Sequence, residues 1–273
     1  MRTGIIIPCY NEANRLDSKA FKSFILSNDD YHLCFVNDGS SDKTMEVLKS
    51  IQTGREDQVS IIDMKKNSGK ASAVRSGARY LYNRTDIDYI GFIDADLSTD
   101  FNDFTKLVES INSNKDLQIV YGSRGKGNGS IERNPIRMLF SKIIKVFTGM
   151  ILGLPISDTQ CGAKVFTRDI IPVAYNQPFI TQWLFDVEIF IRLKNYFGRD
   201  QVMNHLYEQP LQRWVHMDDS KLGIRDAVQI PLKLISIWLN YGRLKQLTNF
   251  PILNISKASV LNAGADLSRP KAA

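Results

Sequence analysis

The sequence predicts an α/β fold with a doubly wound, mostly parallel sheet. Short runs of β-branched and aromatic residues recur at intervals of roughly 25–30 residues, and amphipathic helical segments separate most of them. Polar residues follow the end of each run. Because the carboxyl ends of parallel strands share one edge of a sheet, we expect these polar residues to face a common crevice there.

The first two expected strands are each followed by a polar turn. The first covers residues 4–7, and we expect Pro8 to stop it. A polar turn at residues 9–12 comes directly after it. The second strand, residues 33–37, is followed by Asp38 and then by a turn into an amphipathic helix.

The next three strands continue the alternation of strand and helix. The third expected strand, residues 59–62, leads to a helix that opens at Lys70. The fourth covers residues 89–93, and residues 101–111 then carry apolar side chains at the spacing of a helix. A fifth strand is expected at residues 118–121. This cadence is typical of a mostly parallel sheet.

Two carboxylates follow the fourth strand. Asp94 and Asp96 are separated by one residue, so their side chains point to the same face of an extended chain. Two hard oxygen ligands on a short tether suit Mg²⁺ or Mn²⁺, which shares its coordination shell with water and substrate phosphates. An isolated pair of this kind is usually a solvated turn or a helix cap. Its position at the end of a buried strand favours a metal-bound diphosphate instead.

The pattern changes beyond Gly149. A short strand is expected at residues 165–167, an amphipathic helix at 185–197 and an extended piece at 207–214. No linker rich in Pro, Gly or Ser separates these elements from the first five strands. We therefore assign residues 122–223 to the acceptor half of the same domain.

The C-terminal region divides into two parts. Residues 224–253 carry apolar side chains at helical spacing, interrupted by Pro231 and accompanied by basic residues. Such a stripe fits a core or subunit contact, and it equally fits a helix in a membrane interface. Residues 254–273 are small and polar, which predicts a loosely held tail.

Composition narrows the class of protein. Hydrophobic residues make up 43% and charged residues 23%, as in ordinary globular proteins. No run of eighteen apolar residues and no N-terminal secretory pattern is present, so we expect no span of a bilayer. The three cysteines are far apart and in no metal-binding or redox spacing, which indicates a reducing, cytosolic setting.

The net charge of +6 is concentrated in one segment. Residues 121–148 carry a single acid, Glu132, against several basic residues: Arg124, Lys126, Arg133, Arg137, Lys142 and Lys145. A basic segment of this kind attracts phosphate groups. It lacks interleaved aromatic residues and any nucleic-acid motif, so we expect no nucleic-acid partner.

Seven strings in the chain carry a resemblance to a known family. They are IIIPCYNEANRL, FVNDGSSDKT, KNSGKASAVRSGARYL, FIDADLS, YGSRGKGN, SDTQCGAKVF and RWVHMDDSKL. With them the sequence resembles the family 2 inverting glycosyltransferases of GT-A fold over residues 3–224. Within that family it is most similar to the polyprenyl-phosphate (dolichyl-phosphate) glucosyltransferases and mannosyltransferases. The DTQCG string is closest to the dolichyl-phosphate β-glucosyltransferases.

The resemblance implies a GT-A catalytic domain at residues 1–223, of which residues 1–121 bind the nucleotide sugar. It implies site residues in three groups. The nucleotide site would contain Pro8, Tyr10, Glu12, Asp38 (which reads the base) and Lys70; the metal site would contain Asp94 and Asp96; and the acceptor-phosphate site would contain Arg124, Arg137 and Lys221. Ser98 stands where the mannosyl branch often has a Gln near the metal, so we expect no metal ligand from that position.

The implied reaction moves a hexose, with glucose favoured, from a nucleotide sugar (UDP-glucose or GDP-mannose) to a polyprenyl phosphate. Charge develops on the leaving diphosphate, where a cation held by Asp94 and Asp96 would stabilise it. A phosphate acceptor is already anionic and needs no strong base, so Arg124 and Arg137 would contribute by positioning it. A saccharide hydroxyl acceptor would need a carboxylate to take its proton, and Asp186 or Glu188 is the candidate.

Two further interpretations stay open. The chain can be a family 2 enzyme that glycosylates a saccharide hydroxyl, or a non-catalytic nucleotide-binding protein recruited to membranes by its basic segment and residues 224–253. For the favoured interpretation we expect a peripheral protein on the cytoplasmic face of the membrane. A homo-oligomer is the alternative role for the C-terminal stripe.

Overall fold

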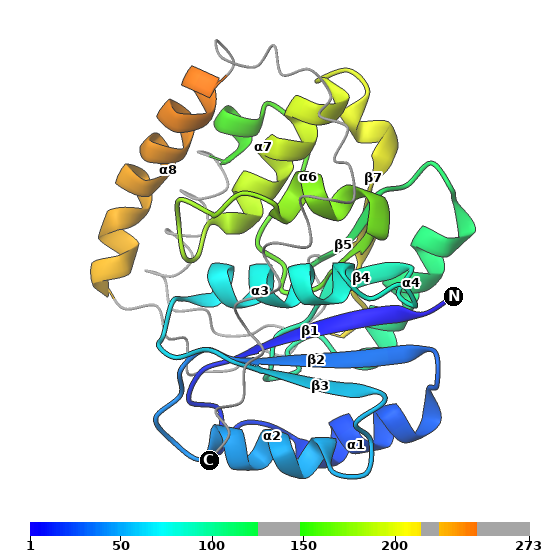
Figure 1. The fold of residues 1–273 in the computed structure, drawn as a ribbon. Coiled ribbons are helices and arrows are strands. Elements are labelled where there is room, and N and C mark those ends of the chain that lie inside the picture. The colour runs from blue at the N-terminus through cyan, green and yellow to red at the C-terminus, as the bar shows by residue number, and fades with distance from the viewer. Residues whose placement is uncertain (125–147, 214–223, 245–273) are drawn as a thin grey trace. The chain divides into compact units, whose positions relative to one another are not determined.

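A computed structural model describes residues 1–124, 148–213 and 224–244. Its centre is a seven-stranded sheet with the order β3-β2-β1-β4-β6-β5-β7 (Figure 1). The strands are β1 (Thr3–Cys9), β2 (Tyr31–Asn37), β3 (Val59–Asp63), β4 (Tyr89–Phe92), β5 (Ile119–Ser123), β6 (Lys164–Thr167) and β7 (Leu206–Pro210). Only β6 pairs antiparallel to its neighbours within this part of the chain. The predicted mostly parallel sheet is confirmed.

Helices cover both faces of this sheet. The helices of the described residues include α1 (Ser18–Ser27), α2 (Thr44–Gln52), α3 (Lys70–Tyr82), α4 (Phe101–Ser113), α6 (Ile171–Tyr175), α7 (Phe185–Phe197) and, near the C-terminus, α8 (Ile224–Leu244), with 3-10 turns η1 (Arg168–Ile170) and η2 (Val202–His205). Helices α1, α2 and α4 pack into one apolar cluster with β1 and β2. Helix α3 lies on the opposite face, as Figure 1 shows, where Gly77 lets it approach Ile6 and Val36.

Strand β1 continues through Pro8, which we expected to end it. The pairing of β1 with β4 ends at Ile6 and Phe92, and the Ile6 carbonyl accepts from the amide of Ile93 at 3.0 Å. Along a strand, successive residues direct their backbone hydrogen-bonding groups to opposite neighbouring strands. Pro8 therefore faces β4, as Ile6 does, just beyond the last pair of residues between β1 and β4. Because proline has no backbone N–H, the hydrogen bonding to β4 stops at Pro8 while the strand itself continues. On the β2 side, the carbonyl of Cys9 still accepts from the amide of Asp38 at 2.8 Å.

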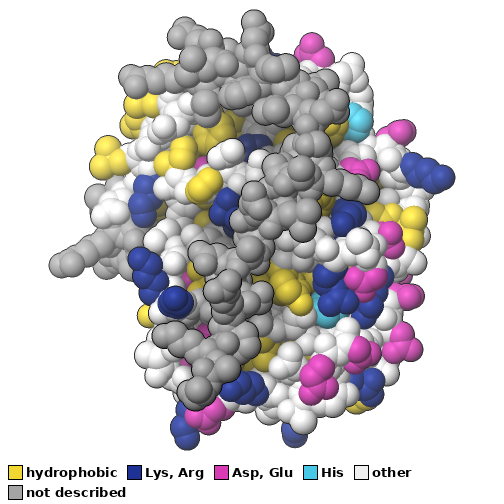
Figure 2. All heavy atoms as spheres, viewed as in Figure 1, with side chains coloured by type: hydrophobic (Ala, Val, Ile, Leu, Met, Phe, Trp, Pro, Cys, Tyr) yellow, Lys and Arg dark blue, Asp and Glu magenta, His cyan; other side chains and the backbone are white. Residues whose placement is uncertain are grey.

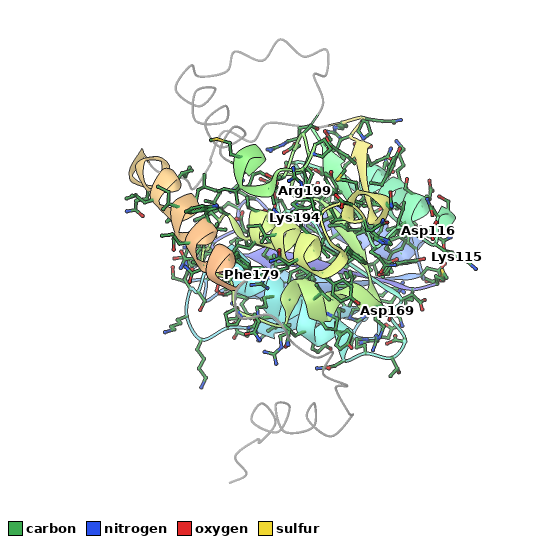
Figure 3. The ribbon with its side chains drawn as sticks, turned by 90° about the horizontal axis from the view of Figure 1, so that it is seen from above. Lys115, Asp116, Asp169, Phe179, Lys194 and Arg199 are labelled. Atoms are coloured by element: carbon green, nitrogen blue, oxygen red, sulfur yellow. The ribbon has the colours of Figure 1, made fainter. Side chains whose placement is uncertain are left out.

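The predicted acceptor half, residues 122–223, is joined to residues 1–121 by β6 and by helices α6 and α7. Phe185 of α7 packs on Phe92 of β4 with ring centroids 5.8 Å apart. Lys194, labelled in Figure 3, lies in the last turn of α7, and its ammonium donates to the carbonyl of Leu152 at 2.7 Å. The predicted helix at residues 185–197 is confirmed.

Helix α8 runs across residue 231 without a break, whereas we expected Pro231 to interrupt it. A proline inside a helix costs about 3 kcal/mol or more, because it removes one backbone hydrogen bond and crowds the preceding turn, but the 21 residues of α8 keep helical backbone on both sides of it. Ile230, Leu234 and Ile237 of α8 are buried, whereas four apolar residues are exposed: Leu232, Ile235, Trp238 and Leu239. All four exposed residues belong to the apolar stripe that was predicted to face a core, a subunit contact or lipid. No helix in the described residues has the length and hydropathy to span a bilayer.

The chain divides into two compact units, Met1–Ile237 and Trp238–Ala273. The first unit contains both predicted halves, residues 1–121 and 122–223. The predicted boundary at residue 223 stays a prediction, since the division found falls inside α8. The predicted tail, residues 254–273, lies outside the described residues.

Candidate functional site

The loops that follow β1, β2 and β4 are tied together at one edge of the sheet. The amide of Asn11 donates to Ser40 Oγ at 2.9 Å, and the amide of Glu12 donates to Thr44 Oγ1 at 2.8 Å. These bonds join the turn after β1 to the loop after β2. Arg15 then joins the same turn to the loop after β4, because its guanidinium lies 3.0 Å from Asp96 Oδ2 and 3.4 Å from Glu12 Oε2.

Asp94 lies two residues beyond the end of β4 and is paired with Lys70. The two side chains approach to 2.5 Å between Nζ and Asp94 Oδ1. Lys70 is the first residue of α3, and Gly69 before it has a φ of 89°, a conformation that favours glycine. The local turn of the chain into α3 thus delivers the ammonium to the end of β4.

Asp96 has a separate set of partners. Besides Arg15, it accepts a hydrogen bond from the amide of Ser98 at 3.0 Å. Leu97 between them has a φ of 51°, which is strained for a side chain branched at Cγ and often marks functional turns. The predicted absence of a ligand from Ser98 remains a prediction, and here Ser98 serves Asp96 through its backbone.

Electrostatics also link these groups. Burial by itself would lower the pKa of Lys70, but the carboxylates of Asp94, Asp186 and Asp96 outweigh it and raise that pKa. The same ammonium therefore lies in the field of both carboxylates of the Asp94–Asp96 pair. A cluster of negative charge at the end of β4 is already balanced by the protein's own cations.

The donor set at this edge fits a hard divalent cation. Asp94 and Asp96 offer carboxylate oxygens, and each is paired with a cationic side chain. No group of three or more His, Cys, Asp or Glu side chains arranged for a metal occurs in the described residues. A Mg²⁺ or Mn²⁺ ion held by these two aspartates would complete its shell with water and substrate phosphate oxygens, which is the usual arrangement for Mg²⁺.

Asp38 is buried and holds the loop that opens α3. Its two carboxylate oxygens accept from the amides of Ser68 and Gly69, both at 2.8 Å. The implied role of Asp38 in reading the base stays a prediction, and in this structure the side chain shapes the entrance to α3. Pro8 and Tyr10 lie at the end of β1 and are half-buried. Because β1 and β4 are parallel, these two residues are at the same edge of the sheet as Asp94 and Asp96, which follow β4.

Asp186 and Glu188, the two candidate bases, are both buried in α7. Asp186 Oδ1 lies 2.6 Å from Lys164 Nζ, and Lys164 is fully buried. Burial raises the pKa of Asp186, and the ammonium groups of Lys164 and Lys70 oppose that rise. The alternatives to a base were an exposed helix face or an acid in the first turn of the helix. Both residues are buried, which contradicts the exposed face, and both lie in the first turn of α7, as the second alternative has it.

Glu188 is occupied by the loop that precedes α7. Its carboxylate accepts from the amides of Ile180 and Thr181, each at 3.0 Å, and from the Thr181 hydroxyl at 3.0 Å. These bonds fix the start of the helix. The Glu188 carboxylate therefore has a structural role, because it holds residues 180–181 against the first turn of α7.

Arg124 lies just beyond the end of β5 and is clamped by Asp158. Its Nε and one terminal nitrogen each donate to Asp158 at 2.8 Å, and its amide donates to the same carboxylate at 3.1 Å. Burial raises the pKa of Asp158, but the bonds and charge of Arg124 outweigh it, so that pKa is lowered. Arg137 and Lys221, the other predicted phosphate ligands, lie outside the described residues.

Three residues of this region escaped the sequence analysis. Arg15 was missed although it stands one helical turn after Glu12, and Lys164 was missed although it directly precedes the apolar run of β6. Gly162 was seen only as part of a string. An ideal Cβ built on it would lie 2.6 Å from Asp94 Cγ, so the absent side chain makes room for that carboxylate.

Comparisons with known proteins show which proteins this chain is similar to. The sequence profile of glycosyl transferase family 2 matches residues 4–172. Two proteins named dolichyl-phosphate beta-glucosyltransferase are similar over most of their length. The one from Drosophila melanogaster is 30% identical over 88% of this chain and 76% of its own, and the one from Dictyostelium discoideum is 29% identical over 87% and 74%.

A solved structure shares the fold. Glucosyl-3-phosphoglycerate synthase from Mycobacterium tuberculosis, in complex with Mn²⁺, UDP-glucose and phosphoglyceric acid, superposes with a TM-score of 0.63. The match covers 87% of this chain and 79% of that one, at 17% sequence identity. At that identity the likeness shows the architecture, and the predicted GT-A fold is confirmed.

Proposed function

This chain belongs to glycosyl transferase family 2, and from that premise we propose that it transfers a hexose from a nucleotide sugar to a polyprenyl phosphate. The chain is a glycosyltransferase. We propose glucose as the hexose and UDP-glucose as the donor. This choice is supported by the names of the relatives from Drosophila melanogaster and Dictyostelium discoideum, which are dolichyl-phosphate beta-glucosyltransferases.

We choose a phosphate as the acceptor because both candidate bases, Asp186 and Glu188, already have partners within the protein. Asp186 is bound to Lys164, and Glu188 is bound to the backbone of residues 180–181. An acceptor hydroxyl would need one of these carboxylates to take its proton, and both already have partners within the protein, whereas a phosphate monoester needs no proton acceptor. Arg124, which Asp158 presents in a fixed orientation, supplies a cation for such a phosphate.

Asp94 and Asp96 would hold the divalent ion, Mg²⁺ or Mn²⁺, that this family fold suggests. When bound, that ion supplies positive charge to the diphosphate as it leaves the sugar. Lys70 lies beside Asp94 and can donate to the phosphate oxygens on the same side. Arg15 holds the Asp96 side chain in place, because its guanidinium pairs with that carboxylate.

The chemistry at the sugar follows from these positions. An oxygen of the acceptor phosphate attacks the anomeric carbon, and the bond from that carbon to the diphosphate oxygen breaks. The electron pair leaves with the diphosphate, and attack from the opposite face inverts the anomeric carbon. Arg124 contributes by holding the acceptor phosphate in line, and no proton has to be removed from it.

We further propose that the protein works at the cytoplasmic membrane surface through α8. Leu232 and Trp238 of this helix are 68% and 58% exposed, and Ile235 and Leu239 are exposed beside them in sequence. Figure 2 shows hydrophobic side chains on the surface that α8 occupies in Figure 1. Amphipathic helices with exposed Trp and Leu lie in membrane interfaces, which is where a polyprenyl phosphate is found.

Transfer of labelled glucose from UDP-glucose to dolichyl phosphate, with Mn²⁺ present, tests the proposal. GDP-mannose in place of UDP-glucose tests the sugar, and dolichol without its phosphate tests the acceptor. We expect product only with the phosphorylated lipid. Transfer to a saccharide hydroxyl and none to dolichyl phosphate would overturn the acceptor. Folded protein that binds UDP but turns over no nucleotide sugar would instead support a non-catalytic role.

A further inference from the structure

The antiparallel strand β6 lies between the two halves of the proposed site. Its neighbours are β4, which leads to Asp94, and β5, which leads to Arg124. Because β6 runs opposite to both, the residues just before it stand at the edge where β4 and β5 end. We call residues 158–163 the β6 lead-in. This segment reaches the donor side and the acceptor side at once.

On the donor side, the lead-in makes room for Asp94. Phe92 pairs with Lys164 in the antiparallel register, so two further steps bring Gly162 opposite Asp94. The Asp94 carboxylate occupies the space that a side chain at Gly162 would need: an ideal Cβ there would overlap Oδ2 and lie 2.6 Å from Cγ. The position of this carboxylate therefore depends on a glycine at residue 162.

On the acceptor side, the lead-in fixes Arg124. Asp158 takes two parallel hydrogen bonds from the guanidinium, which set the plane of that group as well as its distance. The amide of Arg124 donates to the same carboxylate, so backbone and side chain are held together. Asp158 also accepts from the amide of Gln160 at 3.2 Å, which ties the carboxylate to its own loop.

Both ends of the lead-in are anchored. At one end, the amide of Ser157 donates to Glu208 of β7 at 3.1 Å. At the other, the buried ammonium of Lys164 donates to the carbonyl of Cys161 at 2.8 Å, and the amide of Gly122 donates to the carbonyl of Ala163 at 2.9 Å. With both ends held by these bonds, Gly162 stays opposite Asp94 and Asp158 stays beside Arg124.

We propose that the β6 lead-in is the positioning element of the active site. Gly162 sets where Asp94 presents its carboxylate to the metal and the donor, and Asp158 sets how Arg124 presents its guanidinium to the acceptor phosphate. The acceptor part of this inference rests on the proposed function. The donor part rests on the geometry around Asp94 and on the divalent ion that Asp94 and Asp96 would hold.

The first test replaces Gly162 with alanine. Gly149→Ala is the matched control, because a Cβ at Gly149 meets no atom within 4 Å. Mn²⁺ binding in the presence of UDP is measured by calorimetry, with the thermal unfolding midpoint recorded in parallel. We expect Gly162→Ala to weaken Mn²⁺ binding by about 10-fold, the size typical of residues that orient metal ligands, while Gly149→Ala binds as wild type. Unchanged Mn²⁺ affinity in folded Gly162→Ala overturns the proposal.

The second test replaces Asp158 with asparagine and reads both substrates. We expect the KM for dolichyl phosphate to rise at least about 10-fold, since a charged hydrogen-bond pair is lost, while Mn²⁺ and UDP bind as in wild type. The opposite split is expected for Gly162→Ala. If each variant changes the Mn²⁺ affinity and the KM for dolichyl phosphate to the same extent, the β6 lead-in is only a structural support and the proposal is wrong. The Mn²⁺ titration uses no lipid, so a wrong acceptor would leave its result intact.

Discussion

The ammonium of Lys164 lies 2.6 Å from Oδ1 of Asp186, and neither side chain is more than 7% exposed. Lys164 comes from β6 and Asp186 from α7, so this pair joins the sheet to the acceptor half through buried charge. The ring of Phe92 lies below the same ammonium, 5.2 Å from it. Phe92 is the last residue of β4 and comes two residues before Asp94. The Lys164–Asp186 pair therefore lies next to the end of β4.

Removing one partner of this pair should destabilise the protein strongly. Lys164→Met leaves the carboxylate of Asp186 buried without its cation, a situation that costs about 3–5 kcal/mol. Urea unfolding measures the loss, and Lys115→Met, at an exposed position labelled in Figure 3, is the control. The double variant Lys164→Met/Asp186→Leu should recover much of the loss, and a double variant as unstable as the sum of the singles would contradict the pairing.

Loss of either aspartate at the end of β4 should abolish most of the activity. Asp94→Asn and Asp96→Asn each remove one charged ligand for the divalent ion, and we expect turnover to fall by at least about 100-fold, as when preorganised electrostatic groups are removed. Asp116→Asn, at an exposed site labelled in Figure 3, is the control. Circular dichroism should show all three variants folded. Near-normal turnover of Asp94→Asn would remove the metal from the mechanism.

Arg124 should matter for the acceptor and little for the donor. Arg124→Lys keeps a positive charge but loses the two parallel bonds that orient the guanidinium, so the KM for dolichyl phosphate should rise by about 10-fold. Initial rates at varied lipid and varied UDP-glucose separate the two effects. Arg199→Ala, at an exposed position, should behave as wild type. A change confined to the KM for UDP-glucose would place Arg124 on the donor instead.

Apolar residues of α8 should govern attachment to lipid vesicles. Leu232→Lys places a charge on the exposed apolar side of the helix, and losing one buried Leu from an interface costs about 1.5–3 kcal/mol, or roughly 10-fold or more in binding. Co-sedimentation with anionic vesicles measures it. Tyr196→Ser, which removes an exposed aromatic side chain from α7, is the control. Equal vesicle binding by Leu232→Lys and wild type would favour a subunit contact for α8, which sedimentation velocity would then detect.

Stability should fall as the pH is lowered from about 6.5 toward 4, because of His32. Its side chain is buried, its Nε2 pairs with Ser60 Oγ at 2.9 Å, and burial lowers its pKa to about 4. In the unfolded chain, His32 takes up a proton near pH 6.5, whereas in the folded protein it does so only near pH 4. Stability is therefore complete above the unfolded pKa, and roughly 2–3 kcal/mol of it is lost across this window.

The urea midpoint at pH 7 and at pH 4.5 measures that loss. His32→Gln removes the titrating group while keeping a side chain that can pair with Ser60, so its stability should depend less on pH over the same range. A variant with the same pH dependence as wild type would show that other groups set the acid limb.

The order of elements, and the gathering of Asp94, Asp96 and Lys70 at one edge of the sheet, could be predicted from the chain. Strand and helix periodicities are local, and the polar residues after each strand gather at one edge because parallel strands end together. Asp94, Asp96 and Lys70 were found in this way, and the structure brings Lys70 to within 2.5 Å of Asp94. The course of β1 through Pro8 was not predicted, since it depends on where the neighbouring strand β4 stops pairing.

From the amino-acid sequence we could predict a mostly parallel α/β sheet, a pair of carboxylates after its fourth strand and membership of a glycosyltransferase family. The antiparallel course of β6 between β4 and β5 emerges only in the folded chain, and it is what brings Gly162 opposite Asp94 and Asp158 to Arg124. The tertiary structure also decided that Asp186 is neutralised by Lys164, 22 residues away in sequence. Periodicity records which side of its own element a residue occupies. Which charges meet across elements is fixed by strand order and register, and these are set by the packing of the whole sheet.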